Sequence, residues 1–408
     1  MVWSHGRGKS LTMESYLLEI LNLFGRWLHM ITGIAWIGAS FYFVWLDNHL
    51  LPPRKQSDAD QGVGGEVWSV HGGGMYHAQK YLSAPPQMPQ QLHWFKWEAY
   101  STFLSGLFLL ILIYWYGAEL YTIDPQVMTL SKPTAIGIGV ASLVLGWVVY
   151  DLLCRSPIGH NDKWMGLAIL VFVSLVAYML SQVFSGRAAF IHYGAMLGSI
   201  MVANVFFIII PGQKKMIASI EAGNTPDPIH GILGKQRSVH NTYFTLPVLF
   251  VMISNHYALS YNHAYNWLIL IALSLAGALI RVYFVARHKG KASPLILIIA
   301  GILLAAAIVI AAPKPVSSVT GEAVSFTEVK QIIANRCTAC HSQNPTQAGF
   351  ATAPMGVLLD TDAQLLKQAS AVYQQSVVAR AMPLGNLTGM SDEERDKINR
   401  WFNTGAKP

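Results

Sequence analysis

The chain has 408 residues, of which 53% are hydrophobic and 12% are charged. Soluble domains carry about 25% charged residues, so this composition excludes an ordinary soluble enzyme and favours a protein with many membrane-spanning helices. The net charge of +7 does not indicate nucleic acid as a partner, because the basic residues are scattered through short connections and form no stripe.

Apolar runs long enough to cross a bilayer, which takes about 20 helical residues, occur eight times along the chain. The predicted spanning helices cover residues 24–46, 97–116, 134–153, 164–184, 188–210, 238–257, 266–287 and 293–312. If residue 1 lies outside the cell, the connections on the inside carry most of the Lys and Arg residues, as the positive-inside rule requires. We therefore expect the chain to return to the extracytoplasmic side after Pro313.

The most specific motif follows the last of these runs. Residues 337–341 read Cys-Thr-Ala-Cys-His, which is the C-x-x-C-H spacing of a c-type haem attachment site. The thiols of Cys337 and Cys340 can form thioethers with the two vinyl groups of one porphyrin, and His341 can then ligate the iron. A zinc half-site or a redox pair would need more cysteines or a thioredoxin-like strand pattern. The sequence therefore predicts a covalent haem c, on the oxidising side of the membrane.

A sixth iron ligand is expected from a later loop. Met382 is the preferred candidate, because Pro383 holds the loop extended and a thioether ligand raises the potential of a haem. Met355 and Met390 are weaker candidates. An apolar helical stripe before the motif, and a capping box at residues 391–394, predict helices at both ends of this region.

These features together define the expected architecture. The sequence predicts an all-α protein, with an eight-helix transmembrane bundle over residues 1–312 that carries the catalytic site. A linker at 313–320 leads to a small single-haem cytochrome c domain over residues 321–408.

Three histidines fall in the outer half of the predicted bundle. An ionisable group inside a membrane is a functional hypothesis by default. His29 and His192 are the preferred axial pair for a possible haem b, with His256 as a substitute, and small residues near His192 would admit a flat macrocycle. The alternative is that each histidine only makes hydrogen bonds between helices.

Polar residues also gather on the inner side. The connection 47–96 is rich in Gly and Pro, which predicts irregular backbone and, by its length, a function. It and the start of the sixth predicted helix contain imidazoles that can accept protons near neutral pH and cations that can bind an anion. These candidate catalytic residues are His71, His77, His240, Lys80 and Lys96. The alternative is a pair of re-entrant loops whose polar groups satisfy the backbone.

With these residues in view, the whole chain resembles the membrane-bound urate oxidases (urate hydroxylases) that carry a C-terminal cytochrome c domain. The resemblance rests on residues 26–29, 34–42, 71–81, 93–100, 240–254 and the C-x-x-C-H run. It implies oxidation of urate to 5-hydroxyisourate, with electrons leaving through haem c to the respiratory chain and no hydrogen peroxide formed. It also implies a bacterial inner-membrane protein with a periplasmic cytochrome c domain. The first helix alone resembles the haem-binding membrane protoporphyrinogen oxidases.

The resulting hypothesis places the urate monoanion against Lys80 or Lys96 in the membrane domain, where His71, His77 or His240 removes a proton. Haem c, held by His341 and Met382, delivers the electrons to a soluble cytochrome or a terminal oxidase. A different class of function is a quinol-to-cytochrome conduit without purine chemistry, and a third is a porphyrinogen oxidase.

Overall fold

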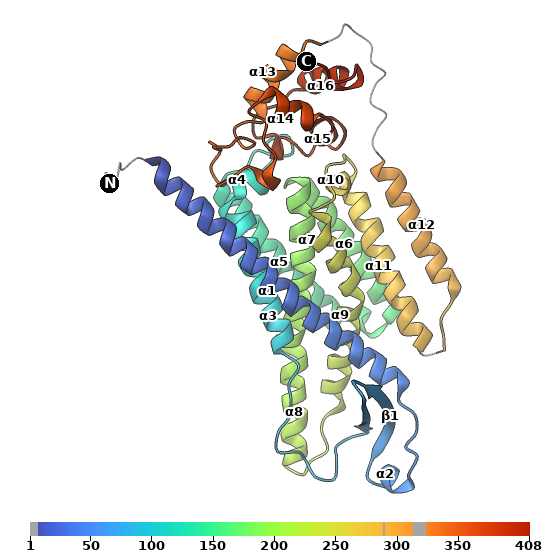
Figure 1. The fold of residues 1–408 in the computed structure, drawn as a ribbon. Helices are drawn as coiled ribbons and strands as arrows, with labels where there is room; N and C mark the ends of the chain where they lie inside the picture. Colours follow the sequence, from blue (N-terminus) through green and yellow to red (C-terminus); the bar gives the residue numbers. More distant parts are fainter. Residues whose placement is uncertain (1–6, 289, 313–323) are drawn as a thin grey trace, which may run out of the picture.

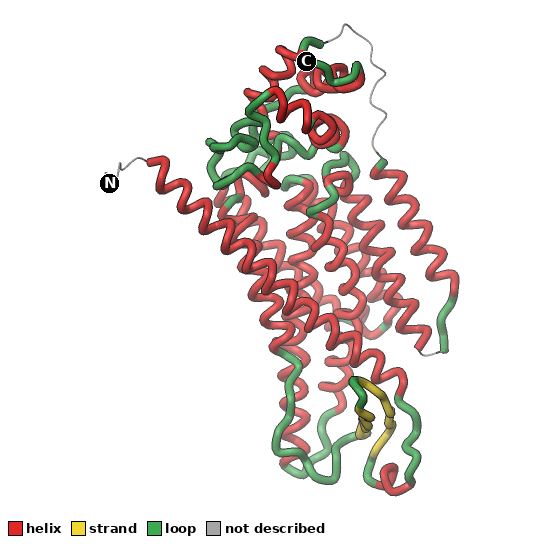
Figure 2. The backbone as a smooth tube through the Cα atoms, in the orientation of Figure 1, coloured by secondary structure: helices red, strands yellow, loops and turns green. Residues whose placement is uncertain are grey.

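A computed structural model describes residues 7–288, 290–312 and 324–408 of the chain. The described residues are mostly helical, and the long helices run side by side with a group of shorter helices at one end (Figures 1 and 2). The predicted linker at 313–320 lies outside the described residues.

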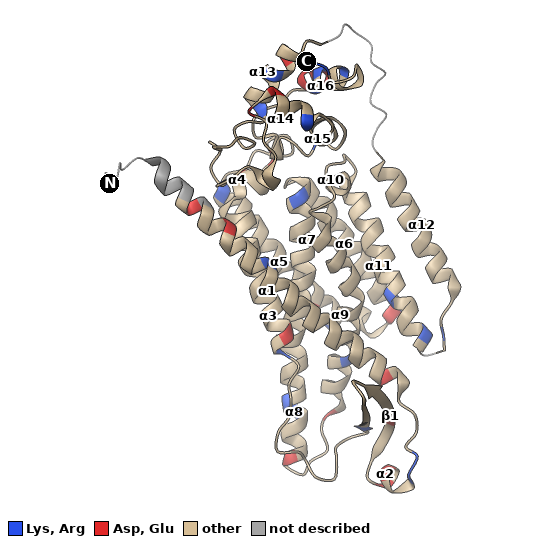
Figure 3. Ribbon diagram, viewed as in Figure 1, with Lys and Arg blue, Asp and Glu red and all other residues tan. Residues whose placement is uncertain are grey.

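Seven helices among the described residues are long and apolar enough to cross a membrane. They are α1 (Arg7–His49), the run of α3 (Trp97–Leu109) and η1 (Leu110–Tyr116), α5 (Lys132–Arg155), α6 (Asp162–Ser181), the run of α7 (Gly186–Ala203), η3 (Asn204–Ile209) and α8 (Ile210–Glu221), α11 (Asn266–His288) and α12 (Pro294–Ala311). Charged residues are sparse along most of their length (Figure 3). Seven of the eight predicted spans coincide with these helices.

The eighth predicted span, 238–257, overlaps α9 (Pro228–Ser254) and runs three residues beyond its end, and α9 is not among those seven. This helix begins ten residues before the predicted span and carries a polar stretch around Arg237 and His240, so its composition is less apolar. It packs against α7, α8 and α11. Short helices connect the long ones: α4 (Ala118–Tyr121), η2 (Pro157–His160) and α10 (Ala258–Tyr261).

The long connection between α1 and α3 is more regular than the sequence predicted. After α2 (Gln56–Asp60), strands β1 (Val63–His71) and β2 (Gly74–Tyr81) form an antiparallel hairpin. Gly72 and Gly73 make its turn with φ of +57° and +82°, a region that glycine enters without steric cost. The predictions of irregular backbone here and of a purely α-helical fold are therefore wrong at this segment. Its glycines lie within the two strands and in the turn that joins them.

The core of the bundle lies around α7. Buried side chains of α5, α6, α7 and α9 form one apolar cluster, and α7 contributes the most, including Phe190, Tyr193 and Met196. Glycines permit the close packing: a Cβ at Gly146 would overlap Met196, and one at Gly194 would lie 2.5 Å from Val251. Gly194 of α7 thus serves helix packing, whereas a Cβ at Gly198 of the same helix would meet nothing within 4 Å.

We expect Gly146→Val to destabilise the protein, because the added side chain meets Met196 in a filled core. Overpacking of this kind costs about 1–3 kcal/mol, so the thermal unfolding temperature in detergent should fall by several degrees. Gly166→Val is the matched control, since a Cβ at Gly166 on α6 meets nothing within 4 Å. Equal unfolding temperatures for the two variants would contradict this packing.

The tail has an apolar cluster of its own. It is formed by Val329, Ile332, Leu365, Ile398, Trp401 and neighbouring side chains. The elements are α13 (Phe326–Arg336), η4 (Pro354–Gly356), α14 (Asp362–Lys367), α15 (Ala369–Tyr373), η5 (Gln374–Val378), η6 (Leu384–Asn386) and α16 (Asp392–Asn403). The predicted capping box is confirmed: the Ser391 hydroxyl and the Glu394 carboxylate bond each other's backbone N–H at the start of α16. The tail lies beside α4 and α10, where Asn262 donates to the Ala379 carbonyl at 3.3 Å.

Candidate functional site

The predicted site residues of the α1–α3 connection have local partners. His77 lies 2.8 Å from Glu66 and stacks on Trp68 across the hairpin, with ring centroids 4.2 Å apart. Lys80 pairs with Asp47 of α1 at 2.6 Å. The backbone N–H of Arg54 and the imidazole of His77 hold the pKa of the Glu66 carboxyl below its usual range.

The other two residues of this group are also separate from His240. His71 lies exposed at the tip of the hairpin, and the Lys96 ammonium lies 5.8 Å from the centroid of the Trp97 ring. Among the described residues, no hydrogen bond or ion pair joins His71, His77, Lys80 or Lys96 to His240. Their role in binding an anion or a proton stays a prediction.

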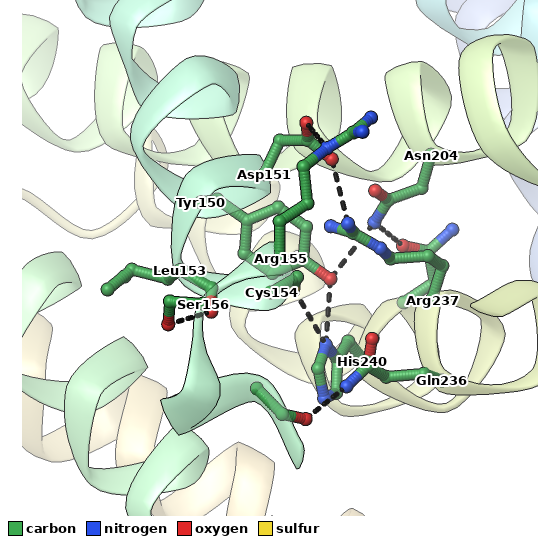
Figure 4. Close-up of polar contacts among 12 residues, drawn as sticks. Tyr150, Asp151, Leu153, Cys154, Arg155, Ser156, Asn204, Gln236, Arg237 and His240 are labelled. Atoms are coloured by element: carbon green, nitrogen blue, oxygen red, sulfur yellow. Dashed lines mark hydrogen bonds and ion pairs between the residues drawn. The ribbon is translucent and has the colours of Figure 1, made fainter. Parts of the chain in front are cut away.

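His240 instead belongs to a cluster between α5 and α9, here called the α5–α9 polar cluster. Its members are Tyr150, Asp151, Cys154, Asn204, Gln236, Arg237 and His240 (Figure 4). The Tyr150 hydroxyl lies 2.7 Å from His240 Nδ1 and accepts a hydrogen bond from Asn204 Nδ2 at 3.2 Å. Cys154 Sγ lies 3.9 Å from the same imidazole nitrogen. Figure 4 shows the side chains from α5 facing those from α9.

A buried ion pair lies within this cluster. Arg237 is 1% exposed, and its Nη2 lies 2.7 Å from one carboxylate oxygen of Asp151, while the other oxygen accepts from Arg155 at 2.6 Å. The Arg237 guanidinium also lies over the Tyr150 ring, 5.1 Å from its centroid. Removing one partner of such a buried pair typically lowers the free energy of unfolding by about 3–5 kcal/mol. We therefore expect the Asp151–Arg237 pair to stabilise the contact between α5 and α9.

Several buried polar atoms of the cluster have no partner among the described residues. They are Arg237 Nε and Nη1, Asn204 Oδ1 and Gln236 Oε1. Buried polar groups in folded proteins are nearly always hydrogen-bonded, so these donors and acceptors are free to bond a water or a bound molecule. A small heterocycle with both C=O and N–H groups on its edge would satisfy both kinds.

Sequence reasoning found His240 but missed Tyr150, Asp151, Asn204 and Arg237. The available signal was Asp151, a carboxylate inside the apolar run 134–153, where an ionisable group is costly and marks a functional site. Its partner is 86 residues away along the chain, so the pairing could not be read from spacing.

The histidines proposed for a haem b are not brought together. The fully buried His192 donates from Nδ1 to the Ala188 carbonyl at 2.9 Å, and its Nε2 accepts from Trp115 Nε1 at 3.1 Å. Both ring nitrogens are therefore engaged. The imidazole of His29 packs against Gly106, nine residues before Trp115, with Nδ1 3.0 Å from the Thr102 carbonyl.

Nine residues correspond to about 13 Å along a helix, so His29 and His192 do not fit as axial ligands of one haem in this arrangement. His256 is exposed in the turn after α9. A haem b in the bundle stays a prediction that these contacts do not support.

The C-x-x-C-H motif occupies the turn that ends α13. The backbone N–H of His341 donates to the Cys337 carbonyl at 2.9 Å, which closes the turn. His341 Nδ1 donates to the Val357 carbonyl at 3.1 Å and leaves Nε2 available. Metal-ligating histidines are commonly oriented by such a bond from the other ring nitrogen.

Neither thiol of the motif is in a disulfide. Burial, and next the negative charge that Cys340 would carry as a thiolate, raise the pKa of the Cys337 thiol to about 12. Among the described residues, no three His, Cys, Asp or Glu side chains group as a metal site, so the remaining ligands of a zinc centre are not supplied. The donor set and its orientation fit a covalent haem.

The three candidate methionines differ in their surroundings. Met355 is 99% exposed, and Met390 is packed in the apolar cluster of the tail. Met382 is half-buried, and its carbonyl accepts from Arg395 Nη1 at 2.8 Å. Its loop is therefore anchored to α16, and Met382 as the sixth ligand stays a prediction.

A comparison with known protein families identifies the family of the helical bundle. Residues 15–312 match the family model described as urate oxidase N-terminal. The chain belongs to this family. The membership indicates an oxidoreductase with a urate-related function, and the matched range includes the α5–α9 polar cluster and ends before the C-x-x-C-H motif. No curated protein and no solved structure matches the chain.

Proposed function

We propose that this urate oxidase family member oxidises urate to 5-hydroxyisourate in a membrane and passes the electrons through haem c to the respiratory chain, without forming hydrogen peroxide. The observation that carries the proposal is the presence, in one chain, of a urate oxidase N-terminal match over residues 15–312 and a C-x-x-C-H motif beyond it. The first supplies the substrate class, and the second supplies a route for single electrons.

The proposed arrangement in the membrane uses all eight long helices. Besides the seven long apolar helices, α9 is long enough to span and packs among them. With the basic connections inside, the tail lies on the periplasmic side of a bacterial inner membrane, where a soluble cytochrome or a terminal oxidase can accept electrons. The α5–α9 polar cluster then lies in the inner half of the bundle.

The overall reaction removes two electrons and one proton from the urate monoanion and adds one water molecule. The urate monoanion loses one proton and two electrons to become neutral dehydrourate. Water then forms a new C–O bond at C5, and its remaining hydrogen goes to a ring nitrogen, which gives 5-hydroxyisourate. No oxygen molecule takes part, so no peroxide is produced.

The chain's own residues provide the proton chemistry. When His240 Nδ1–H donates to the Tyr150 oxygen, Nε2 is free to act as the general base, and Tyr150 orients the ring. Arg237 Nε and Nη1 are free to donate to C=O groups of the heterocycle, while Asn204 Oδ1 can accept from its N–H groups.

The haem is held by residues of the tail. Cys337 and Cys340 would form the thioethers, His341 would ligate the iron through Nε2, and Met382 would supply the sixth ligand. When bound, haem c accepts and releases one electron at a time.

Urate-dependent reduction of a soluble cytochrome c tests the proposal. Membranes that contain the protein should bleach the urate absorbance and reduce two equivalents of the cytochrome per urate, without oxygen and without peroxide. Membranes from cells without the protein are the control. Reduction by a quinol and not by urate would instead establish the conduit without purine chemistry.

A further inference from the structure

A second buried arginine lies outside the α5–α9 polar cluster. Arg281 of α11 is 8% exposed, and the central carbon of its guanidinium lies 3.9 Å from the centroid of the Phe41 ring of α1. Its Nε and Nη2 atoms are buried and have no hydrogen-bond partner among the described residues. No carboxylate of the described chain lies within ion-pair distance of it.

Arg281 differs from the other arginines inside the bundle because its guanidinium makes no hydrogen bond or ion pair with any described residue, whereas Arg187, which also lacks an ion pair, donates to the Asn255 carbonyl at 3.0 Å. Arg237 is paired with Asp151, and Arg26 is exposed and bonded to Asn22. A buried cation without a counter-charge is strongly unfavourable, more so within a membrane span. The positive charge at Arg281 therefore requires an anion that the described residues do not provide.

The surroundings of Arg281 are aromatic and basic. Phe41, Trp45 and His49 recur every four residues, so they share one side of α1, and Trp45 stacks on His49 with ring centroids 5.0 Å apart. The His49 ring in turn meets His288 of α11 at 5.0 Å. These groups would favour a flat anion over a small inorganic one.

Arg281 also lies at a similar level along the bundle axis to His240, the proposed general base. A Cβ at Gly277 of α11 would lie 3.1 Å from Leu246 of α9, and α9 and α11 run in opposite directions (Figure 1). One helical turn beyond Gly277, Arg281 therefore lies at the level of Thr242, which is less than one turn from His240.

We propose that Arg281 holds the negative charge of the substrate, a planar heterocyclic anion, through its Nε–H and Nη2–H bonds. These two donors point in parallel from one edge of the guanidinium, a geometry that matches paired acceptors on an anion. The guanidinium lies over the Phe41 ring, which leaves its edge donors available. The assignment rests on the proposed function, because it takes the urate monoanion as that anion.

Equilibrium dialysis with radiolabelled urate tests the assignment on the full-chain protein in phosphatidylcholine nanodiscs. Arg281→Gln should weaken urate binding at least tenfold, and Arg281→Lys, which keeps the charge and loses the paired donors, should weaken it less. Arg287→Gln is the matched control, since Arg287 is exposed in the last turn of the same helix. A monodisperse gel-filtration profile and a wild-type circular dichroism spectrum establish that each variant is folded.

Wild-type urate affinity in Arg281→Gln would overturn the assignment and leave the proposed function intact. If phosphatidylglycerol nanodiscs then also raise the unfolding temperature of the wild type and not that of Arg281→Gln, the ligand of Arg281 is a lipid phosphate. Failure of the wild type to bind and to oxidise urate would instead reject the proposed function, and this assignment with it.

Discussion

Urate oxidation is expected to fall below about 1% of the wild-type rate when His341 is replaced by alanine or when Cys337 and Cys340 are both replaced. His341→Ala removes the imidazole that Val357 orients, and the double replacement removes both thioether bonds. Without a haem held by both the thioethers and the imidazole, the electrons of urate lose their proposed route out of the bundle. Haem absorbance and urate-dependent reduction of a soluble cytochrome measure the two losses.

Thr338→Ala is the matched control for this experiment. Thr338 lies between the two cysteines, and its hydroxyl donates to the Ala334 carbonyl of α13, so its loss leaves the thiols and the imidazole in place. Urate binding should persist in all these variants, because the bundle has a separate core. Full urate oxidation in a variant without haem absorbance would exclude haem c from the electron path.

Replacing His240 with glutamine is expected to lower kcat by about 10²–10⁴, the usual contribution of a positioned general base. Tyr150→Phe should cause a smaller loss, of about tenfold, because it removes only the group that orients the imidazole. The residual rate of His240→Gln should rise with pH, since the substrate then loses its proton without help. Initial rates of urate bleaching across a pH series measure these effects.

The control for His240 is His160→Gln. His160 is exposed at the end of η2, at the same end of the bundle. It should leave kcat and its pH dependence unchanged. A His240→Gln variant with the wild-type pH profile would show that another group removes the proton.

The helices were predictable because a bilayer imposes one strong requirement, a long apolar run, and seven such runs appear as helices where the sequence predicted them. α9 was harder to delimit, since its polar first turns read as a connection. The hairpin was missed for a related reason. Glycines such as Gly64, Gly65 and Gly74 lie within its strands, and the composition of the segment resembled that of an irregular loop.

The candidate site residues also differ in how far the sequence could predict them. The haem attachment motif is local, so five consecutive residues predicted it, and His341 has an orienting partner in the structure. The α5–α9 polar cluster is non-local: Tyr150 and His240 are 90 residues apart. The charges inside apolar runs at Asp151 and Arg281 were the available signal for further sites that the sequence prediction missed, and spacing alone does not identify the partner of either charge.

The position of the polar cluster relative to the tail has an energetic consequence. Tyr150 lies 18 residues below the start of α5, about 27 Å at 1.5 Å per residue, and the tail lies at the opposite end beside α4 and α10. In the proposed orientation, electrons that leave the purine travel outward, away from the negative inner side of the energised membrane. Each elementary charge that crosses the full bilayer gains about 2.3 kcal/mol per 100 mV. An energised cell would therefore drive urate breakdown forward, and each turnover would partly discharge its membrane.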